Sequence, residues 1–317
     1  MDLKRLRTFI RVAEDGSLSK ASDRLRLAQP ALSRHIKLLE AEIGHDLFVR
    51  DGRGMQLTEA GQELLARIGG LVQQIEKSIN DVRSLASAPQ GHVALGMMPT
   101  VSYILSARVA KRVATELPDV SLRIVEGYAG HLIDWLHRGE IDATLLYGPG
   151  SDLHLRVTDL LLEELVLVGP ANSDLDPKTP VPVSTLGKLK LVLPSKPHGL
   201  RSVVESAAAR ARTNLRIQFE ADSFRVLKDL VEEGLGYTVL PISAIYREQR
   251  QGKFKYAHLV KPKVVRHVIL ALPPSRTDTR ATSAVVSLVL DEIGKLVKSG
   301  QWQAYSLPDM KDWPHTE

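Results

Sequence analysis

Residues 18–40 read LSKASDRLRLAQPALSRHIKLLE and contain two short amphipathic patterns separated by a few residues. The second pattern opens with Gln29 and Pro30, and proline is favoured in the first turn of a helix because its missing N–H has no acceptor there. A short helix, a tight turn and a second helix with a polar, basic outer face form a helix-turn-helix, whose second helix enters the major groove of duplex DNA. We therefore expect the chain to bind duplex DNA. The spacing predicts a buried face made of Ala31, Leu32, Ile36, Leu39 and Ile43.

Segments on either side extend this pattern to a small domain. An apolar stripe at helical spacing runs through residues 3–13, and Ser17 or Ser19 is expected to cap the helix that follows. Residues 47–57 contain two strand-like runs around an Asp-Gly step, which indicates a hairpin. Three helices and a hairpin predict an all-α winged helix-turn-helix over residues 1–58.

A long helix is expected after this domain, and residues 59–86 are taken as a linker helix. Its apolar residues recur in steps of four and three, which indicates a coiled-coil seam for dimerisation. The alternative is an ordinary amphipathic helix docked on a core, but the position between two domains and the polar residues on the other faces favour the seam. Residues 87–91 are rich in helix breakers and predict a hinge. The seam comprises Leu64, Ile68, Leu71, Ile75, Ile79, Val82 and Leu85.

Residues 92–300 alternate between strand-like and helical runs, which predict an α/β domain with mostly parallel sheets. They are too many for one small sheet, so we expect two lobes joined by crossing strands. Lobe I covers about 92–162 and 267–300, lobe II covers about 163–266, and the tail 301–317 receives no function. Strands are predicted at 93–98, 121–126, 142–147, 165–168, 191–193, 217–220, 237–240 and 268–272, and helices at 103–117, 131–138, 200–212, 223–233 and 283–298.

Composition and charge narrow the function classes. The chain has 317 residues of which 44% are hydrophobic, enough for buried cores, so a disordered protein is excluded. The net charge is +5, and residues 1–58 contribute +3 of it with 11 Lys/Arg against 8 Asp/Glu. The absence of cysteine excludes disulfides, thiolate catalysis and cysteine-based zinc or redox sensing. The N-terminus has no apolar signal region and no apolar run approaches membrane-spanning length, so a soluble cytoplasmic protein is expected.

Two other function classes fit the sequence less well. An enzyme is the main alternative, but the chain has no glycine-rich phosphate loop with its lysine, no Gly-x-Ser-x-Gly elbow and no His-Glu-x-x-His. A free solute-binding protein would match residues 92–300 alone and would not carry the N-terminal helices. His131 and His137 are six residues apart, the wrong spacing for one helical face, so neither a metal nor a cofactor is expected.

The order of these parts resembles the LysR-type transcriptional regulators, over nearly the whole chain to roughly residue 300. The most specific likeness lies at the N-terminus, and EGLGYTVLP at 233–241 is similar to the glycine turn entering a strand of the family's second lobe. The resemblance implies a winged helix-turn-helix, a linker coiled coil, a periplasmic-binding-protein-like effector domain and assembly as a dimer of dimers. It also implies promoter DNA, a small-molecule effector and RNA polymerase as partners. The N-terminal motifs are LRTF at 6–9, GS at 16–17, AQPALS at 28–33, LLE at 38–40, Gly44, LFVR at 47–50 and LTEAG at 57–61.

Side-chain chemistry at the N-terminal end predicts separate roles in DNA contact. Gln29 can pair with adenine through two hydrogen bonds, and Arg34 with guanine or with phosphate. Lys37 is equally well explained as a phosphate contact or as a solvated surface residue. The wing arginines suit phosphates and a narrow minor groove, whose negative potential attracts arginine. The predicted DNA-contacting residues are Gln29, Pro30, Ser33, Arg34, Lys37, Arg50 and Arg53.

The effector site is expected in the cleft between the lobes, near strand ends and helix N-termini. Residues 98–102 form a strand-to-helix turn where hydroxyls and free amides can hold a carboxylate. Arg201 starts a helix of the other lobe and offers a fork for an anion, with a solvent-facing helix residue as the even alternative. A small anionic metabolite is therefore expected to bind here and switch transcription. The candidate effector-binding residues are Thr100, Ser102, Tyr128, Tyr147, His198 and Arg201.

Overall fold

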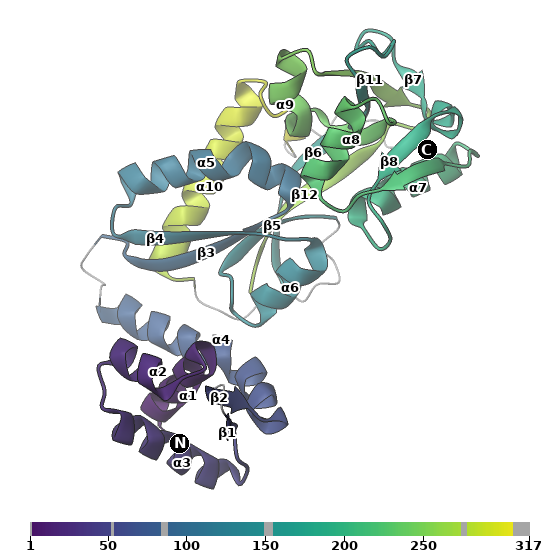
Figure 1. The fold of residues 1–317 in the computed structure, drawn as a ribbon. Coiled ribbons are helices and arrows are strands. Elements are labelled where there is room, and N and C mark those ends of the chain that lie inside the picture. Colours follow the sequence, from purple (N-terminus) through teal and green to yellow (C-terminus); the bar gives the residue numbers. More distant parts are fainter. Residues whose placement is uncertain (1, 52–53, 84–87, 149–154, 274–277, 307–317) are drawn as a thin grey trace. The chain divides into compact units, whose positions relative to one another are not determined.

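The computed structural model describes residues 2–51, 54–83, 88–148, 155–273 and 278–306. The chain forms two compact units, the first comprising residues 1–87 together with 137–140 and the second the remainder (Figure 1). None of the helices in these described stretches is long and apolar enough to cross a membrane.

The N-terminal unit consists of three helices and a two-stranded hairpin around one core, as the sequence predicts. The elements are α1 (Leu3–Asp15), α2 (Leu18–Leu25), α3 (Gln29–Ile43), β1 (Phe48–Asp51) and β2 (Gly54–Leu57). Helix α3 turns Leu32, Ile36 and Leu39 into the core, whereas Ala31 and Ile43 are half-buried at its margin. The apolar spacing therefore predicted the buried face of α3 correctly.

Two glycines fix the turn between α1 and α2 against the hairpin. Gly16 ends α1 in the left-handed region with a φ of 59°, and its carbonyl accepts a hydrogen bond of 2.9 Å from the Met55 amide of β2. A Cβ on Gly54 would lie 2.5 Å from that carbonyl oxygen, so a larger residue would push the hairpin away. Ser17 caps α2 by accepting a hydrogen bond of 3.5 Å from the Lys20 amide, so the first of the two candidate serines is the cap.

The long helix expected after the hairpin is α4 (Glu59–Arg83), which has 25 residues. Leu64 and Ile68, the first two residues of the predicted seam, pack against the core of the N-terminal unit. These turns therefore behave as an ordinary docked helix, which was the alternative interpretation of the pattern.

The middle of the predicted seam is exposed. Leu71, Ile75 and Ile79 are 56%, 47% and 40% exposed, which is unusual for three large apolar side chains at helical spacing. The side chains of Val82 and Leu85 lie outside the described residues. We call Leu71, Ile75 and Ile79 the α4 stripe.

Lobe I of the C-terminal unit is built from two separate parts of the chain. Its core draws on residues 93–161 and again on residues 268–302. Helices α5 and α10 lie side by side on it (Figure 1). The elements are β3 (Gly91–Met97), α5 (Pro99–Glu116), β4 (Val120–Glu126), α6 (Ala129–His137), β5 (Ala143–Tyr147), β12 (Val265–Leu272), α10 (Arg280–Lys298) and β13 (Ala304–Ser306).

Lobe II has its own core, formed by residues between 165 and 264. Helix α9 and strand β11 were not among the predicted elements, because α9 is short and strongly charged and β11 alternates polar with apolar residues. The elements are β7 (Val181–Pro182), the 3₁₀ helix η1 (Val183–Lys188), β8 (Lys190–Leu193), α7 (Gly199–Arg210), β9 (Arg216–Glu220), α8 (Phe224–Glu232), β10 (Thr238–Pro241), α9 (Ile242–Arg250) and β11 (Phe254–Val260).

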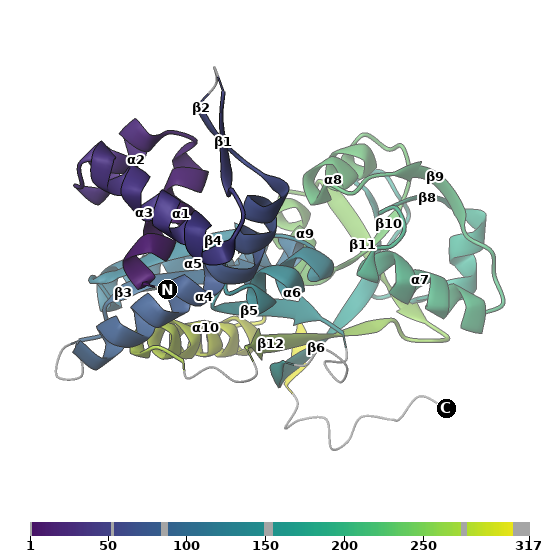
Figure 2. The same cartoon turned by 90° about the horizontal axis from the view of Figure 1, so that it is seen from below.

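One long strand, β6 (Arg156–Pro170), runs through both lobes and joins their sheets (Figure 2). Its first half pairs with β12, and its second half pairs with β10 and β11. All three pairings are antiparallel, and that of β12 reflects a chain that enters lobe II along β6 and returns along β12. The expectation of crossing strands is confirmed, but that of mostly parallel sheets is wrong at the centre of this unit. Parallel pairs of described strands join β3 to β4 and β5, β8 to β9, and β7 to β11.

The C-terminal segment that the sequence analysis set aside as a tail begins inside the fold. Trp302 is 1% exposed and belongs to the core of lobe I. Strand β13 pairs with β6, with Ala304 opposite Glu163. The first residues after α10 are therefore part of the domain rather than an appendage.

Candidate DNA-binding face and effector cavity

Helix α3 presents a polar face to solvent. Its core-facing residues recur at helical spacing, so the positions between them point away from the unit. Gln29 and Pro30 lie in the first turn of α3, and residues near the N-terminus of a recognition helix are those that contact base edges. Of the predicted DNA contacts, Gln29, Pro30, Arg34, Lys37 and Arg50 are exposed, Ser33 is half-buried, and Arg53 lies outside the described residues.

Two polar side chains without a predicted role hold α3 in place. His35 shares a hydrogen bond of 2.9 Å with the hydroxyl of Thr8 on α1. The Glu40 carboxylate accepts hydrogen bonds of 2.9 and 3.3 Å from the amides of Leu47 and Phe48, which ties the end of α3 to the wing. Helix and wing are thus positioned together.

A small cavity of about 30 Å³ lies between lobes I and II. This volume is well below the roughly 300–1,000 Å³ of small-molecule sites, so the lobes are nearly closed around the cavity. Four of the candidate residues, namely Thr100, Tyr128, Tyr147 and His198, line it. The other lining residues are Met98, Pro99, Pro194, Leu200, Ala221, Asp222, Phe224, Leu227, Leu240 and Arg266.

Among the described residues that line the cavity, the cationic side chain is Arg266 of β12. Arg266 was not among the residues predicted from the sequence. It is 6% exposed, and its Cζ lies 3.7 Å from the centroid of the Tyr147 ring. Its Nη2 donates to the Thr100 hydroxyl at 2.9 Å, and that hydroxyl shares a further hydrogen bond with the Tyr147 hydroxyl. Burial raises the pKa of Tyr147 to about 12, although the nearby charge of Arg266 opposes this shift. Tyr147 is therefore a neutral phenol at physiological pH.

Glu163 of β6 balances the charge of Arg266 and is itself only 1% exposed. Arg266 Nε and Nη2 lie 2.8 and 2.7 Å from Glu163 Oε2. The other oxygen, Oε1, accepts hydrogen bonds of 2.6 Å from the Ser243 hydroxyl and 2.8 Å from Trp302 Nε1. A buried ion pair is tolerated when its remaining hydrogen-bonding positions are filled, and these contacts fill those of Glu163. Its partners come from both lobes and from the C-terminal segment.

The rim of the cavity joins the two lobes directly. Tyr128 of lobe I donates a hydrogen bond to the backbone carbonyl of Asp222 in lobe II. Its ring also meets the His198 ring edge-on, with 4.8 Å between centroids. Burial lowers the pKa of His198, the charge of Arg266 adds to this effect, and Asp222 opposes it. His198 Nδ1 accepts from the Leu200 amide at 3.1 Å, so the neutral imidazole carries its proton on Nε2.

The structure does not bring Ser102 and Arg201 to the cavity wall. Ser102 is buried on α5 but is not among the lining residues. The guanidinium of Arg201 is held by Glu205 at 2.7 Å, by Glu220 at 3.1 Å and by the carbonyl of Pro194 at 3.0 Å. A glutamate four residues further along a helix is a frequent partner of arginine, and this contact draws Arg201 along α7.

A second bridge between the lobes lies beside the cavity. Tyr103 of α5 donates to Glu248 of α9 at 2.8 Å, and Lys228 of α8 pairs with the same carboxylate at 2.5 Å. Lys228 Nζ also lies 4.2 Å from the centroid of the Tyr103 ring. Burial alone would raise the pKa of Glu248, but the hydrogen bonds from Lys228 and Tyr103 lower it. The three residues are far apart in the sequence, which gave no local signal of their contact.

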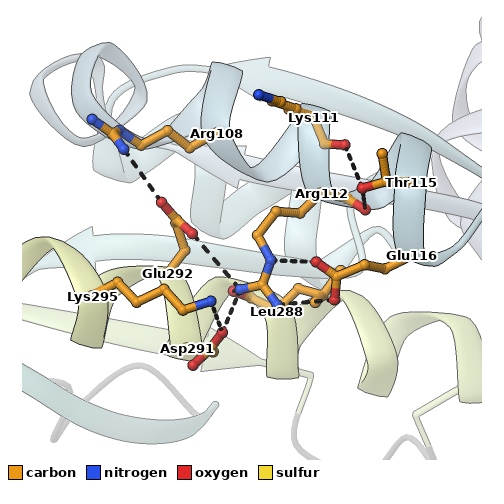
Figure 3. Close-up of polar contacts among 9 residues, drawn as sticks. All are labelled: Arg108, Lys111, Arg112, Thr115, Glu116, Leu288, Asp291, Glu292 and Lys295. Carbon is orange, nitrogen blue, oxygen red and sulfur yellow. Dashed lines mark hydrogen bonds and ion pairs between the residues drawn. The ribbon is translucent and has the colours of Figure 1, made fainter.

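Charged residues on the surface of lobe I clamp α5 to α10 (Figure 3). Arg112 of α5 pairs with Glu116 at 2.6 Å and with Asp291 of α10 at 2.5 Å. Arg108 lies 3.6 Å from Glu292 of α10. Helix α5 begins at the cavity and α10 leads to Trp302, so this network holds together the two helices that serve the site.

Two domain families match the chain. Residues 3–62 match the family described as a bacterial regulatory helix-turn-helix protein of the lysR family, and residues 86–294 match the LysR substrate binding domain. The chain belongs to the LysR family of transcriptional regulators. A LysR-type regulator is a DNA-binding transcription factor and not an enzyme, so the enzyme alternative is excluded. A free solute-binding protein is excluded as well, because the helix-turn-helix family matches the N-terminal unit.

This LysR-type regulator resembles curated relatives over most of its length. It is 29% identical over 305 residues to the HTH-type transcriptional regulator BbuR of Bordetella bronchiseptica, covering 96% of this chain and 94% of BbuR. It is 31% identical over 245 residues to the nitrogen assimilation regulatory protein nac of Klebsiella aerogenes, covering 77% of this chain and 79% of nac.

Full-length LysR-type structures share the fold. A full-length OxyR variant from Pseudomonas aeruginosa has a TM-score of 0.71 at 23% identity, covering 92% of this chain and 94% of that one. Full-length CbnR in complex with its target DNA has a TM-score of 0.67 at 18% identity, and the match covers 93% of this chain and 99% of CbnR. These likenesses confirm the fold class, a helix-turn-helix unit followed by a two-lobed α/β domain.

Proposed function

We propose that this LysR-type regulator binds promoter DNA as a dimer of dimers, and that a small anionic metabolite bound between lobes I and II switches transcription. The cavity carries this proposal, because a buried arginine, a threonine hydroxyl and the start of a helix surround one small space. A regulator that binds the chromosome acts in the cytoplasm, and RNA polymerase is its partner downstream.

DNA contact is assigned to the outer face of α3 and to the wing. Gln29 and Arg34 are exposed on this face and are able to form paired hydrogen bonds with adenine and guanine edges. Ser33, Lys37 and Arg50 supply hydroxyl and cationic groups that suit phosphates. Glu40 and His35 hold α3 in place, so the side chains proposed to contact bases start from a fixed position.

Dimerisation is assigned to the α4 stripe. Apolar side chains this exposed on a helix are normally covered by a partner, and a second copy of α4 offers the same pattern. A two-fold dimer places two α3 helices on half-sites about one helical turn or more apart, so the operator is expected to be an interrupted palindrome.

Effector binding is assigned to the cavity wall formed by the start of α5. Proline at the first position of α5 has no N–H, and the Thr100 amide has no backbone acceptor among the described residues. The first turn of a helix carries partial positive charge and attracts carboxylates. Ligand-driven closure shifts the equilibrium only if the ligand binds one arrangement of the lobes better, and a molecule gripped from both lobes meets this condition.

DNA binding and assembly are tested together with the purified full-length protein. Selection of labelled genomic fragments followed by footprinting should yield an interrupted palindrome, and light scattering should give the mass of a tetramer. Random capture of fragments, or a monomeric mass at micromolar protein, would refute this part of the proposal.

The effector site is tested with an isosteric pair of variants. Thr100→Val removes the hydroxyl beside Arg266, whereas Thr144→Val makes the same change in buried β5, where the Thr144 hydroxyl has no hydrogen-bond partner in the described structure. Metabolites that co-purify with the parent are identified by mass spectrometry, and the response of a reporter gene is measured. Loss of response in Thr100→Val alone, with basal DNA binding intact, is expected, while a full response would place sensing elsewhere.

A further inference from the structure

We propose that Arg266 selects the effector, and that the effector carries a single carboxylate on an otherwise apolar body. The carboxylate accepts its hydrogen bond from Nη1 of Arg266. This inference rests on the proposed function, because it assumes that the effector occupies the cavity between the lobes.

The hydrogen bonds of Arg266 leave one of its nitrogen atoms available. A guanidinium has five N–H donors. Nε donates to Glu163, and Nη2 donates to Thr100 while lying 2.7 Å from Glu163 Oε2. Within the described residues no hydrogen bond joins Nη1 to the protein. Both hydrogens of Nη1 therefore remain for a ligand, on a guanidinium that Glu163 and the Tyr147 ring hold rigid.

A carboxylate suits this position better than a neutral carbonyl group. The free Thr100 amide at the start of α5 is a second donor in the same wall, and the partial positive charge of the helix end adds to that of the guanidinium. Hydrogen bonds to an ionised acceptor are roughly twice as strong as those between neutral groups. The site therefore prefers a ligand with an ionised carboxylate over the corresponding neutral amide.

A second negative charge finds no partner among the described residues that line the cavity. Asp222 on the far wall is kept ionised, because hydrogen bonds from the Ser195 hydroxyl and amide at 2.7 and 2.8 Å lower its pKa. Burial lowers the pKa of His198, so it is neutral, and Glu163 already balances Arg266, the cation among the described residues of the cavity wall. The remaining wall is apolar and consists of Met98, Pro99, Pro194, Leu200, Ala221, Phe224, Leu227 and Leu240. The site therefore selects a monoanion with an apolar body.

The probes for the test differ in one group at a time. Hexanoate has one carboxylate on an apolar chain, hexanamide is its neutral counterpart, and adipate adds a second carboxylate to the same six-carbon chain. Binding to the full-length protein is measured by calorimetry. Hexanoate is expected to bind at least about tenfold more tightly than either of the other two. Equal affinity of hexanoate and hexanamide, or no binding of hexanoate at about 10 mM, would overturn the inference without any variant.

The role of Arg266 is tested in a background that keeps the buried charges balanced. Removing Arg266 alone would leave the buried Glu163 without its counter-charge, so Arg266→Met is combined with Glu163→Gln. This double variant should bind hexanoate and hexanamide within about twofold of each other. Arg201→Met is the matched control, because it removes a buried arginine of lobe II that the cavity does not include. A folded double variant that keeps the preference for the acid, or an Arg201→Met variant that loses it, would overturn the assignment to Arg266.

A cavity-filling variant separates this inference from the proposed function. Ala221 lines the cavity, and Ala221→Leu adds bulk to its wall. If hexanoate binds this variant as it binds the parent, the cavity is not the binding site and the proposed function fails with the inference. If Ala221→Leu blocks binding while the double variant still prefers hexanoate over hexanamide, the cavity remains the binding site and only the role of Arg266 is refuted.

Discussion

Charged substitutions in the α4 stripe should weaken dimerisation about a thousandfold. Leu71 and Ile75 are 56% and 47% exposed in the single chain. Fully burying such a side chain stabilises by about 1.5–3 kcal/mol, so covering the exposed half contributes about 1 kcal/mol for each residue. A two-fold interface uses every residue twice. The variant Leu71→Glu/Ile75→Glu therefore loses about 4 kcal/mol, and each 1.4 kcal/mol is tenfold in affinity.

Sedimentation of the parent and the variant over a range of protein concentrations measures this loss. The control carries glutamate at Gln62 and Ala66, which are exposed on the far side of α4 from Leu71. The control should sediment like the parent and protect both half-sites, whereas the stripe variant should dissociate and bind half-sites weakly. An unchanged dissociation constant in the stripe variant, with native helix content, would refute the seam.

Four further outcomes are expected. Gln29→Ala should cost about 1–3 kcal/mol in binding to the specific site and relax the preference at one base pair, as measured by gel shifts on specific and scrambled DNA. Gly54→Ala should lower the free energy of unfolding by about 1–3 kcal/mol, because Gly54 has a φ of 124° and an added Cβ would collide with the Gly16 carbonyl oxygen. Thermal unfolding of the full-length protein measures this loss. Burial lowers the pKa of His198 below the value of about 6.5 that it has in the unfolded chain. As pH falls through about 6.5 the unfolded chain is therefore protonated first, and the free energy of unfolding should decrease. Denaturant unfolding across this range should show a weaker dependence on pH in His198→Asn. Trp302→Phe should destabilise by about 2 kcal/mol, because the Glu163 carboxylate loses a buried donor, as calorimetric unfolding will show.

Local patterns predicted the N-terminal unit well. The buried and exposed faces of α3 follow from spacing alone, and the Asp-Gly step located the hairpin. The ends of strands in lobe I also led to Thr100 and Tyr147, because ligands in open α/β sheets collect at strand ends. These predictions depend on neighbours within a few residues, which one sequence displays.

Pairings across the chain were not predictable from the same information. Arg266 and Glu163 lie in different strands, and neither position is a strand end. A signal was present, since each charge interrupts an apolar run and a buried charge requires a partner, but the sequence did not say which partner. Arg201 was chosen for its place at a helix start, although Glu205 four residues on was a competing partner. The mixed direction of the strands likewise depends on how β6 and β12 cross.

The anchoring of Trp302 determines where this chain can be cut. The matched substrate-binding family ends at residue 294, whereas α10 continues to Lys298 and β13 to Ser306. A recombinant fragment trimmed to the family boundary would lack the last turn of α10, expose the core of lobe I and remove a donor from Glu163. Such a fragment would distort the wall that carries Arg266, and ligand screens on it would miss the effector. Fragments of the effector domain should therefore extend through Ser306, and purification tags belong beyond it.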